Sequence, residues 1–258
     1  MPDMLNLNKK ISFFKENGYC IIDLFNKSEF NYLLNKVFAK INSNISAPNK
    51  KLKLKNIKNY HKHSAEFEHK KIINSINRYL VLDKKLIKPI MKNILIKEIS
   101  HFYWGHSNFR VKWVGSLKNP MKDNATGFRI ARPSKISKKD VGGEHLDLHY
   151  GGTNNTNLKK LFTLWCPLIG MSSKYTLRIS PKSHKKKHPL NSLSKQKKFI
   201  SRVLTKSYVK KLKFIRPNLS PGQVIFFHPN LVHGSSTNLG KQTRVSLDFR
   251  IFNTTYTK

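Results

Sequence analysis

Apolar residues recur at helical spacing over the first hundred positions of this chain, and short apolar runs replace them further on. The spacing predicts a first helix over 5–17, and the apolar run 20–25 predicts a short strand after it. Apolar residues within 30–41 predict a second helix, which Asn26 or Ser28 is placed to cap. We therefore expect the chain to open with a helix, a strand and another helix.

The next part of the chain changes character twice. The lysine-rich stretch 43–63 has little periodicity and predicts a surface loop, whereas 65–99 predicts a helical region interrupted near Asp83 and Pro89. Three histidines lie in or just after the loop. Their polar surroundings favour solvated side chains over a metal site for His61, His63 and His69.

From about residue 108 onward, short apolar or alternating runs are separated by clusters of Gly, Pro, Asn and Ser, a pattern typical of strands and turns. About eight short strands after a helical first half predict a β-sandwich or barrel faced by helices. A lysine-rich insertion at 182–213, with a helix around 194–206, interrupts them. The strands are predicted at 109–115, 127–132, 144–150, 160–168, 175–179, 212–216, 223–227 and 244–253.

The length of 258 residues fits a single domain, with a mainly helical part over 1–105 and a β-rich core over 106–258. Cys20 and Cys166 both lie in apolar runs, which favours buried, reduced thiols over a disulfide. No apolar run approaches the roughly 20 residues that span a bilayer, and the N-terminus lacks an apolar signal core. We therefore expect a soluble, cytoplasmic protein; the sequence does not indicate its oligomeric state.

The charge is strongly positive, with 50 Lys and Arg against 13 Asp and Glu and a net charge of +37. Such a field attracts anions, including nucleic acid. Lys greatly outnumbers Arg, however, whereas specific readers of nucleic acid favour Arg for its planar, two-pronged contacts. The composition therefore favours a small anionic substrate over nucleic acid as the partner.

The candidate chemistry lies in two segments far apart in the chain. If 144–150 is a strand, His145, Asp147 and His149 share one face, because alternate residues point the same way. Polar groups on an inner face are costly without partners, and a metal ion would satisfy two of them. Two imidazoles and one carboxylate suit iron(II), and His233, which follows an apolar run and precedes a Gly, is the best second imidazole. By geometry alone, Asp147 can pair with either His145 or His149.

The spacing of this His-x-Asp pair, the distant His233 and Arg244 eleven positions later resembles that of the iron(II)/2-oxoglutarate dioxygenases, and of their phytanoyl-CoA-dioxygenase-like subgroup in particular. The likeness covers 12–25 and about 128–252. It departs from the subgroup at Lys182, where a Gly is usual, and at Gln223, where an Asp is usual. Further similar motifs are FKENGY at 14–19, LWCPL at 164–168, LRISPKSH at 177–184 and PGQVIFFH at 221–228.

The resemblance implies a double-stranded β-helix core, a jelly roll of the cupin kind, with helices packed on one face. It also implies roles for particular side chains. Arg244 would pair with the distal carboxylate of 2-oxoglutarate, Ser246 would donate to the same carboxylate, and Asn238 would lie beside it. His149 would be a substrate-contacting or supporting group. The implied metal ligands are His145, Asp147 and His233.

The resemblance further implies an oxygenase that uses iron(II), 2-oxoglutarate and O2 to hydroxylate or otherwise oxidise a small molecule. A polar or anionic metabolite of carbohydrate or natural-product biosynthesis is the expected substrate. Two other functions are compatible with parts of the sequence. One is oxidative demethylation of nucleic acid, and the other is ligand binding by a jelly roll without catalysis.

Overall fold

The computed structural model describes most of the chain. The described residues are 4–43, 54–64, 66–74, 79–113, 123–136, 140, 143–147, 161–170, 175–189 and 204–256.

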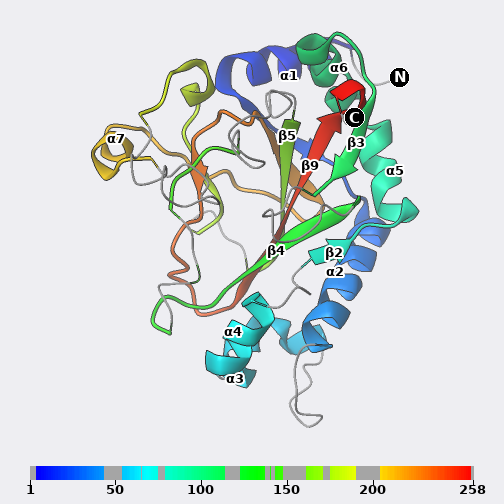
Figure 1. The fold of residues 1–258 in the computed structure, drawn as a ribbon. Helices are drawn as coiled ribbons and strands as arrows, with labels where there is room; N and C mark the ends of the chain where they lie inside the picture. The colour runs from blue at the N-terminus through cyan, green and yellow to red at the C-terminus, as the bar shows by residue number, and fades with distance from the viewer. Residues whose placement is uncertain are drawn as a thin grey trace.

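A large antiparallel sheet forms the centre of the molecule (Figure 1). Its longest strand, β9, pairs with β5 along one edge and with β4 and then β3 along the other. The seven strands follow the order β1-β7-β5-β9-β4-β2, with β3 beside β9. Their bounds are β1 Tyr19–Asp23, β2 Tyr79–Val81, β3 Phe109–Lys112, β4 Ala125–Ala131, β5 Leu161–Ile169, β7 Gln223–Phe227 and β9 Arg244–Asn253.

A smaller sheet faces one side of the large one. It consists of β6, Arg178–Ile179, and β8, His233–Gly234, extended by isolated bridges from His145 to His233 and from Ile179 to Ile215. An apolar cluster lies between the two sheets and is built from Tyr19, Trp165, Leu177, Ile179, Ile225, Phe227 and Leu231. The sequence prediction of a two-layered β core is therefore confirmed.

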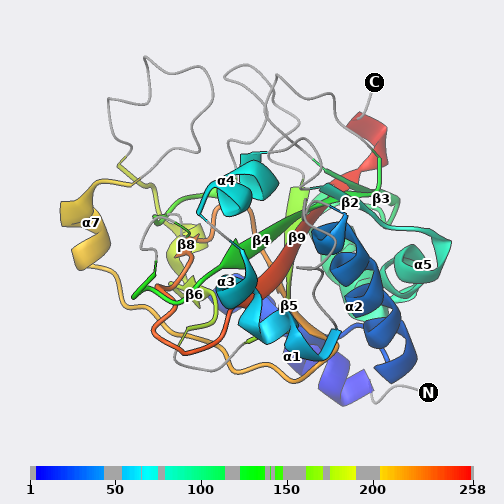
Figure 2. The same ribbon diagram turned by 90° about the horizontal axis from the view of Figure 1, so that it is seen from below.

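Helices cover the other side of the large sheet (Figures 1 and 2). They are α1 Met4–Asn17, α2 Lys27–Asn42, α5 Lys84–Lys92 and α6 Ile94–Trp104. The alternation of β9 explains this arrangement, because successive side chains of a strand point to opposite faces. Its odd-numbered residues, Val245, Leu247, Phe249 and Ile251, are fully buried in the core that includes these helices.

Several helix boundaries follow from local chemistry. Asn26, one of the two predicted caps, begins α2 with a capping box. Its side chain accepts from the Glu29 backbone, and the Glu29 side chain accepts from the Asn26 backbone. Asp83 caps α5, which agrees with the predicted interruption there. Pro89, however, lies inside α5, and the break comes at Asn93, which ends α5 and caps α6.

The loop predicted over 43–63 and the helical region predicted over 65–99 were partly wrong. Residues 54–74 contain the 3-10 helix η2 and two short helices, and the strand β2 interrupts the region that was expected to be helical. Propensity alone missed these elements because tertiary contacts decide them: β2 pairs with β4, and Ile57, Tyr60 and Ile72 are buried in the main core. The elements are η2 Leu54–Asn59, α3 Tyr60–His63 and α4 Glu66–Asn74.

The predicted strands were most accurate where the chain is most apolar. The bounds of β7 and β9 match the predicted 223–227 and 244–253, whereas 212–216 yields only the bridge at Ile215. The helix expected around 194–206 lies mostly outside the described residues, and a short helix α7, Lys206–Lys210, begins where it was expected to end. The remaining short 3-10 helices are η6 Ser183–Lys185 and η8 Thr254–Tyr256.

Two further observations bear on the sequence expectations. Cys20 and Cys166 are buried free thiols, as predicted. Among the described residues, no helix has the length and apolar character needed to cross a membrane.

Candidate metal centre

The small sheet and the segment beside it bring together three side chains that the sequence separates widely. His145 and His233 form a two-way backbone bridge, with N–O distances of 2.9 and 3.2 Å. Their Nε2 atoms lie 3.7 and 3.6 Å from Oδ1 of Asp147. One ligand atom from each of the three residues lies within 4.8 Å of the others. The structure therefore brings together the three residues that the sequence singled out.

Both histidine rings are oriented by backbone carbonyls. Nδ1 of His145 lies 2.9 Å from the Gly143 carbonyl, and Nδ1 of His233 lies 3.0 Å from the Leu231 carbonyl. A carbonyl only accepts, so in the neutral form of each ring the proton lies on Nδ1 and the lone pair of Nε2 is directed at the carboxylate. Burial, and then the neighbouring His233, lowers the pKa of His145 to about 4, so this ring is neutral and able to ligate at neutral pH.

The Asp147 carboxylate is fully buried, and its two oxygens have different surroundings. Oδ2 accepts from the Thr163 hydroxyl at 2.5 Å and from Nη2 of Arg250 at 3.1 Å. Oδ1 has no hydrogen-bond partner among the described residues. Burial alone would raise the pKa of Asp147, but Arg250 and the two imidazoles outweigh it and hold that pKa below its usual range.

A buried charged oxygen without a partner is strongly unfavourable. A divalent cation between Oδ1 and the two Nε2 atoms would remove that cost. Two imidazole nitrogens and one carboxylate oxygen are the donor set that suits iron(II) with open positions for further ligands. The residues present therefore fit the expected metal.

Arg244 begins β9 and is almost completely buried. Its Nη1 donates to the carbonyls of Tyr175 and Ser236, the latter at 2.9 Å. Ser236 is three residues beyond His233, so these bonds hold the guanidinium next to the segment that carries the second imidazole. Burial lowers the pKa of Arg244 to about 10, which leaves it charged at neutral pH.

The inner face of β9 forms a row of polar side chains. Ser246 lies two residues after Arg244 on the same face and is also buried. Asp248 and Arg250 continue the row, joined by a 2.8 Å bond from Nη1 of Arg250. Across the sheet, Arg129 of β4 faces this row opposite Ser246 and lies 3.6 Å from Oδ1 of Asp248.

Sequence reasoning missed two of the groups that touch Asp147. Arg250 lies six residues after Arg244 and therefore on the same face of the strand, so strand alternation carried a signal for it. Thr163 had no such signal, because a threonine in an apolar strand resembles any other core residue. Its place opposite Arg250 in the sheet register brings both donors to one oxygen.

The predicted neighbour of the co-substrate, Asn238, is fully engaged by the backbone around it. Its amide nitrogen donates at 2.8 Å to the carbonyls of both Ala131 and Gln242. Its Oδ1 accepts from the Gly240 backbone at 3.1 Å. Asn238 therefore braces the loop between β8 and β9 with all of its amide groups, and the prediction that it contacts 2-oxoglutarate stays untested.

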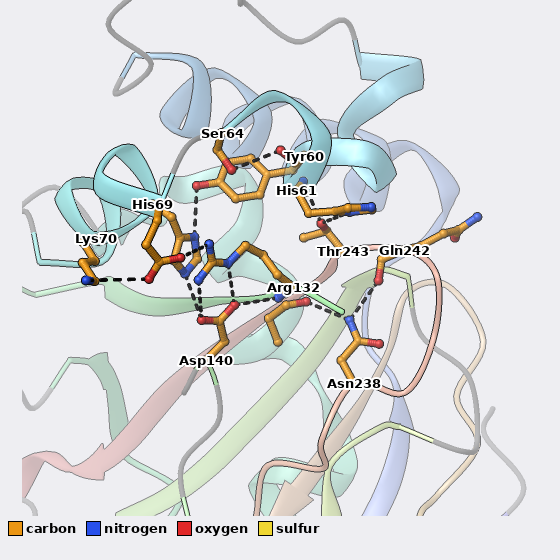
Figure 3. A network of polar contacts seen from close by, with 12 residues as sticks. Tyr60, His61, Ser64, His69, Lys70, Arg132, Asp140, Asn238, Gln242 and Thr243 are labelled. Atoms are coloured by element: carbon orange, nitrogen blue, oxygen red, sulfur yellow. Dashed lines mark hydrogen bonds and ion pairs between the residues drawn. The ribbon is translucent and has the colours of Figure 1, made fainter. Parts of the chain in front are cut away.

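A second polar cluster ties the helices α3 and α4 to the end of β4 (Figure 3). Arg132 is only 2% exposed and donates through Nε and Nη2 to Asp140 at 2.8 and 3.0 Å, and through Nη1 to Glu66 at 2.6 Å. His69 lies 3.3 Å from Asp140 and 3.2 Å from the Tyr60 hydroxyl. The expectation of a solvated His69 was wrong, because this cluster buries it.

The same helical segment contacts Thr243, the residue that precedes Arg244 (Figure 3). The Thr243 backbone donates to the Lys58 carbonyl at 2.7 Å, and the Thr243 hydroxyl accepts from the His61 backbone at 3.2 Å. The His61 ring also lies within 3.0 Å of that hydroxyl. Residues 54–74 are therefore fastened to the residue that precedes the proposed co-substrate arginine.

The role implied for His149 is not tested by the structure. His149 falls outside the described residues. Arg178 pairs with Glu144 and lies over the Phe214 ring, whereas its strand neighbour Ile179 points between the sheets. Arg178 is therefore on the side of the small sheet away from the metal centre.

Comparison with known proteins gives one family and one fold. The model of the family described as "Phytanoyl-CoA dioxygenase (PhyH)" matches residues 14–246. The search of curated proteins finds no match. Similar solved structures include the epimerase SnoN in complex with Fe3+, alpha ketoglutarate and nogalamycin RO, with 13% identity, a TM-score of 0.59, and coverage of 97% of this chain and 85% of that one.

Two more of these structures have the same order of similarity. EctD from S. alaskensis in its apoform is 14% identical, with a TM-score of 0.56 and coverage of 96% of this chain and 77% of that one. The alpha ketoglutarate dependent carbocyclase SnoK is 14% identical, with a TM-score of 0.54 and coverage of 95% and 83%. At such identities the likeness establishes the fold, and the expected jelly-roll core is confirmed.

Proposed function

This chain belongs to the phytanoyl-CoA dioxygenase family and is an iron(II)- and 2-oxoglutarate-dependent dioxygenase, and from that premise we propose that it oxidises a small polar or anionic metabolite at the His145, Asp147 and His233 centre. One observation carries the assignment of the site. The fully buried Oδ1 of Asp147 has no hydrogen-bond partner among the described residues, and two imidazole Nε2 atoms point at it from 3.6 and 3.7 Å.

In this proposal each side chain has a specific task. His145, His233 and Oδ1 of Asp147 would hold iron(II) on one face of the ion. The Gly143 and Leu231 carbonyls keep both imidazoles in the tautomer that ligates through Nε2. When bound, iron(II) with 2-oxoglutarate and O2 supplies the oxidation of a substrate C–H bond, while the co-substrate becomes succinate and CO2.

Arg244 and Ser246 would bind the distal carboxylate of 2-oxoglutarate. Arg244 is held in place by two carbonyls that accept from a single nitrogen, Nη1, and a guanidinium has further donors with which to bind a carboxylate. Because Arg244 is buried, such an ion pair would form in a low dielectric, where it is much stronger than in water. The same burial excludes bulk water from the co-substrate.

The proposed substrate class is supported by the net charge of the chain and by the small molecules bound in similar structures. A net charge of +37 creates a field that raises the local concentration of anions. The similar SnoN structure contains nogalamycin RO, and a similar structure of EctD contains 5-hydroxyectoine. Each of these two structures therefore contains a small organic molecule. We therefore favour a metabolite of natural-product or carbohydrate biosynthesis.

The site assignment is tested by anaerobic titration with iron(II) and 2-oxoglutarate. We expect the weak visible charge-transfer band of the chelate in the wild-type protein. The band should vanish in His145→Ala, Asp147→Ala and His233→Ala, and should persist in the matched control His101→Ala, whose side chain is exposed on α6. A wild-type protein without the band would favour a ligand-binding module, and a band that survives in His145→Ala would refute the ligand assignment.

The substrate class is tested by succinate release from 2-oxoglutarate with a panel of metabolites. We expect phosphorylated or carboxylated members to stimulate release, and to do so more strongly at low salt, because salt screens the attraction. Stimulation by uncharged members alone would contradict the anionic substrate. Stimulation by a methylated oligonucleotide alone would favour nucleic-acid demethylation instead.

A further inference from the structure

The metal-site carboxylate is held asymmetrically, and the asymmetry has a structural origin. Both hydrogen bonds to Asp147 reach the same oxygen, Oδ2, from Thr163 on β5 and Arg250 on β9. Thr163 and Arg250 are direct partners in the register of these strands. The sheet pairing itself therefore directs two donors at one oxygen and leaves the other oxygen, Oδ1, facing the imidazoles.

Arg250 has little freedom to leave this position. It is 2% exposed, its Nη1 donates to Asp248 at 2.8 Å, and its guanidinium lies 5.0 Å from the centre of the Trp113 ring. A guanidinium held in this way by a carboxylate and an aromatic ring presents its donors in a fixed direction. The Nη2 bond to Asp147 therefore belongs to a rigid cluster rather than to a mobile side chain.

A carboxylate can bind a metal ion through one oxygen or through both. In an octahedral ion, two imidazoles and one carboxylate oxygen leave three positions, and a co-substrate that chelates through two atoms leaves one. A second oxygen from the same carboxylate would take one of those three positions, so co-substrate and O2 could bind together only by displacing it. The binding mode of Asp147 would therefore decide whether a position stays open once the co-substrate has chelated the ion.

We propose that Arg250 is a positioning residue that keeps Asp147 a one-oxygen ligand and so preserves the open coordination position of the metal centre. Thr163 assists it at the same oxygen, and Asp248 fixes Arg250 from behind. The proposal rests on the function proposed above and adds residues to it that touch neither iron nor co-substrate. It explains why an arginine, a costly residue to bury, lies on the inner face of β9.

The test uses the full chain loaded with Co(II) and titrated with 2-oxoglutarate in a calorimeter, together with the visible spectrum of Co(II), which reports its coordination. In Arg250→Met, Oδ2 keeps only the hydrogen bond from Thr163 and can bind the metal ion in competition with the chelating co-substrate. We expect the dissociation constant of 2-oxoglutarate to rise about 10- to 100-fold, the range by which metal affinity or activity typically falls when a group that orients a metal ligand is lost. Arg250→Lys keeps one donor and the charge, and should recover part of the affinity.

A structural comparator separates positioning from loss of stability. Phe249→Leu alters the neighbouring residue on the opposite face of β9, within the helix-covered core, and should lower the melting temperature without changing the affinity for 2-oxoglutarate. Folded Arg250→Met with wild-type affinity and an unchanged Co(II) spectrum overturns the proposal. If Arg250→Met does not fold, wild-type affinity in both Arg250→Lys and Asp248→Asn overturns it.

Failure of the underlying function gives a different result. A wild-type protein that does not bind Co(II), or whose Co(II) form does not bind 2-oxoglutarate, contradicts the dioxygenase site and the role of Arg250 together. A wild-type protein that binds both, with Arg250 variants that bind equally well, contradicts the role of Arg250 alone.

Discussion

Replacing Arg132 with Met tests how the helical segment 54–74 is fastened to the β core. Arg132 and its partner Asp140 have side chains that are only 2% and 4% exposed. Three bonds link them, two from the guanidinium and one from the Arg132 backbone at 2.9 Å, and a further bond reaches Glu66. Met fills much of the same apolar space but offers no charge and no donors, so Asp140 keeps only the backbone bond and His69.

The magnitude follows from the burial of Asp140. Removing one partner of a buried ion pair costs about 3–5 kcal/mol, because the other charge stays buried without compensation. His69 remains 3.3 Å from Asp140, so we expect the lower end, about 3 kcal/mol. For a protein of this size, 1 kcal/mol lowers the melting temperature by about 2–4 °C, which gives a fall of about 6–12 °C.

The pH dependence has a definite sign. Burial alone would raise the pKa of Asp140, but the bonds from His69 and Arg132 outweigh it and hold that pKa below its usual range. A carboxylate with a depressed pKa contributes stability above its unfolded pKa of about 3.9 and loses that contribution as the pH falls through the folded value. The difference in stability between wild type and Arg132→Met should therefore be full at pH 7 and narrow below about pH 4.

The assay is equilibrium unfolding in urea of the metal-free protein at pH 7 and at pH 3.5, with Asp140→Asn and the double variant completing a mutant cycle. In the double variant, we expect Asp140→Asn to recover part of the stability lost in Arg132→Met, because it removes the charge that Arg132 compensates. A cost below about 1 kcal/mol for Arg132→Met, in the range of a surface ion pair, would refute the reasoning. Strictly additive single costs would refute the coupling between the two residues.

Three further predictions concern other parts of the fold. Burial, and then His184, lowers the pKa of His228 to about 3, so this group should lower wild-type stability by up to about 1.4 kcal/mol per pH unit as the pH falls below about 6.5. Urea midpoints measured at pH 7 and pH 5 should decline less in His228→Gln than in the wild type, and an equal decline would contradict the buried neutral ring. Cys20 and Cys166 are buried, and burial raises the pKa of both thiols, so a thiol reagent should label neither until urea unfolds the protein; fast labelling of the native protein would show that the β core opens. Gly222 has φ +88° and a Cβ there would lie 2.2 Å from a carbonyl oxygen, so Gly222→Ala should lower the melting temperature by several degrees. Gly143→Ala, where no atom of the described residues lies within 4 Å of the added Cβ, should not lower it, and similar values for the two variants would refute the backbone constraint.

Much of the fold was predictable because its elements depend on neighbours along the chain. The apolar pattern of 244–253 predicted the bounds of β9, and the structure adds that one face of this strand is apolar and the other polar. Asn26 and Glu29 carried the start of α2, since a capping box involves residues only three positions apart. The His-x-Asp spacing identified two candidate ligands, although within 143–147 the structure has only an isolated bridge at His145 in place of the strand predicted over 144–150.

The failures have an equally physical cause. His69 lies in a polar stretch, and its burial depends on Asp140, a residue seventy-one positions away that no local pattern connects to it. The strand β2 is three residues long and forms because it pairs with β4. Its own apolar residues carry no strand signal, and the sequence pattern predicted a helix there. Such elements obtain their structure from partners rather than from propensity.

The chain by itself determined the periodicity of its strands and helices, the chemical character of its candidate ligands and the sign of its electric field. The tertiary structure alone decided which oxygen of Asp147 faces the imidazoles, because that choice depends on Thr163 and on Arg250, which is 103 positions away. Local patterns arise from the geometry of one strand or one helix, whereas the orientation of a buried carboxylate arises from donors that only the pairing of distant strands brings together.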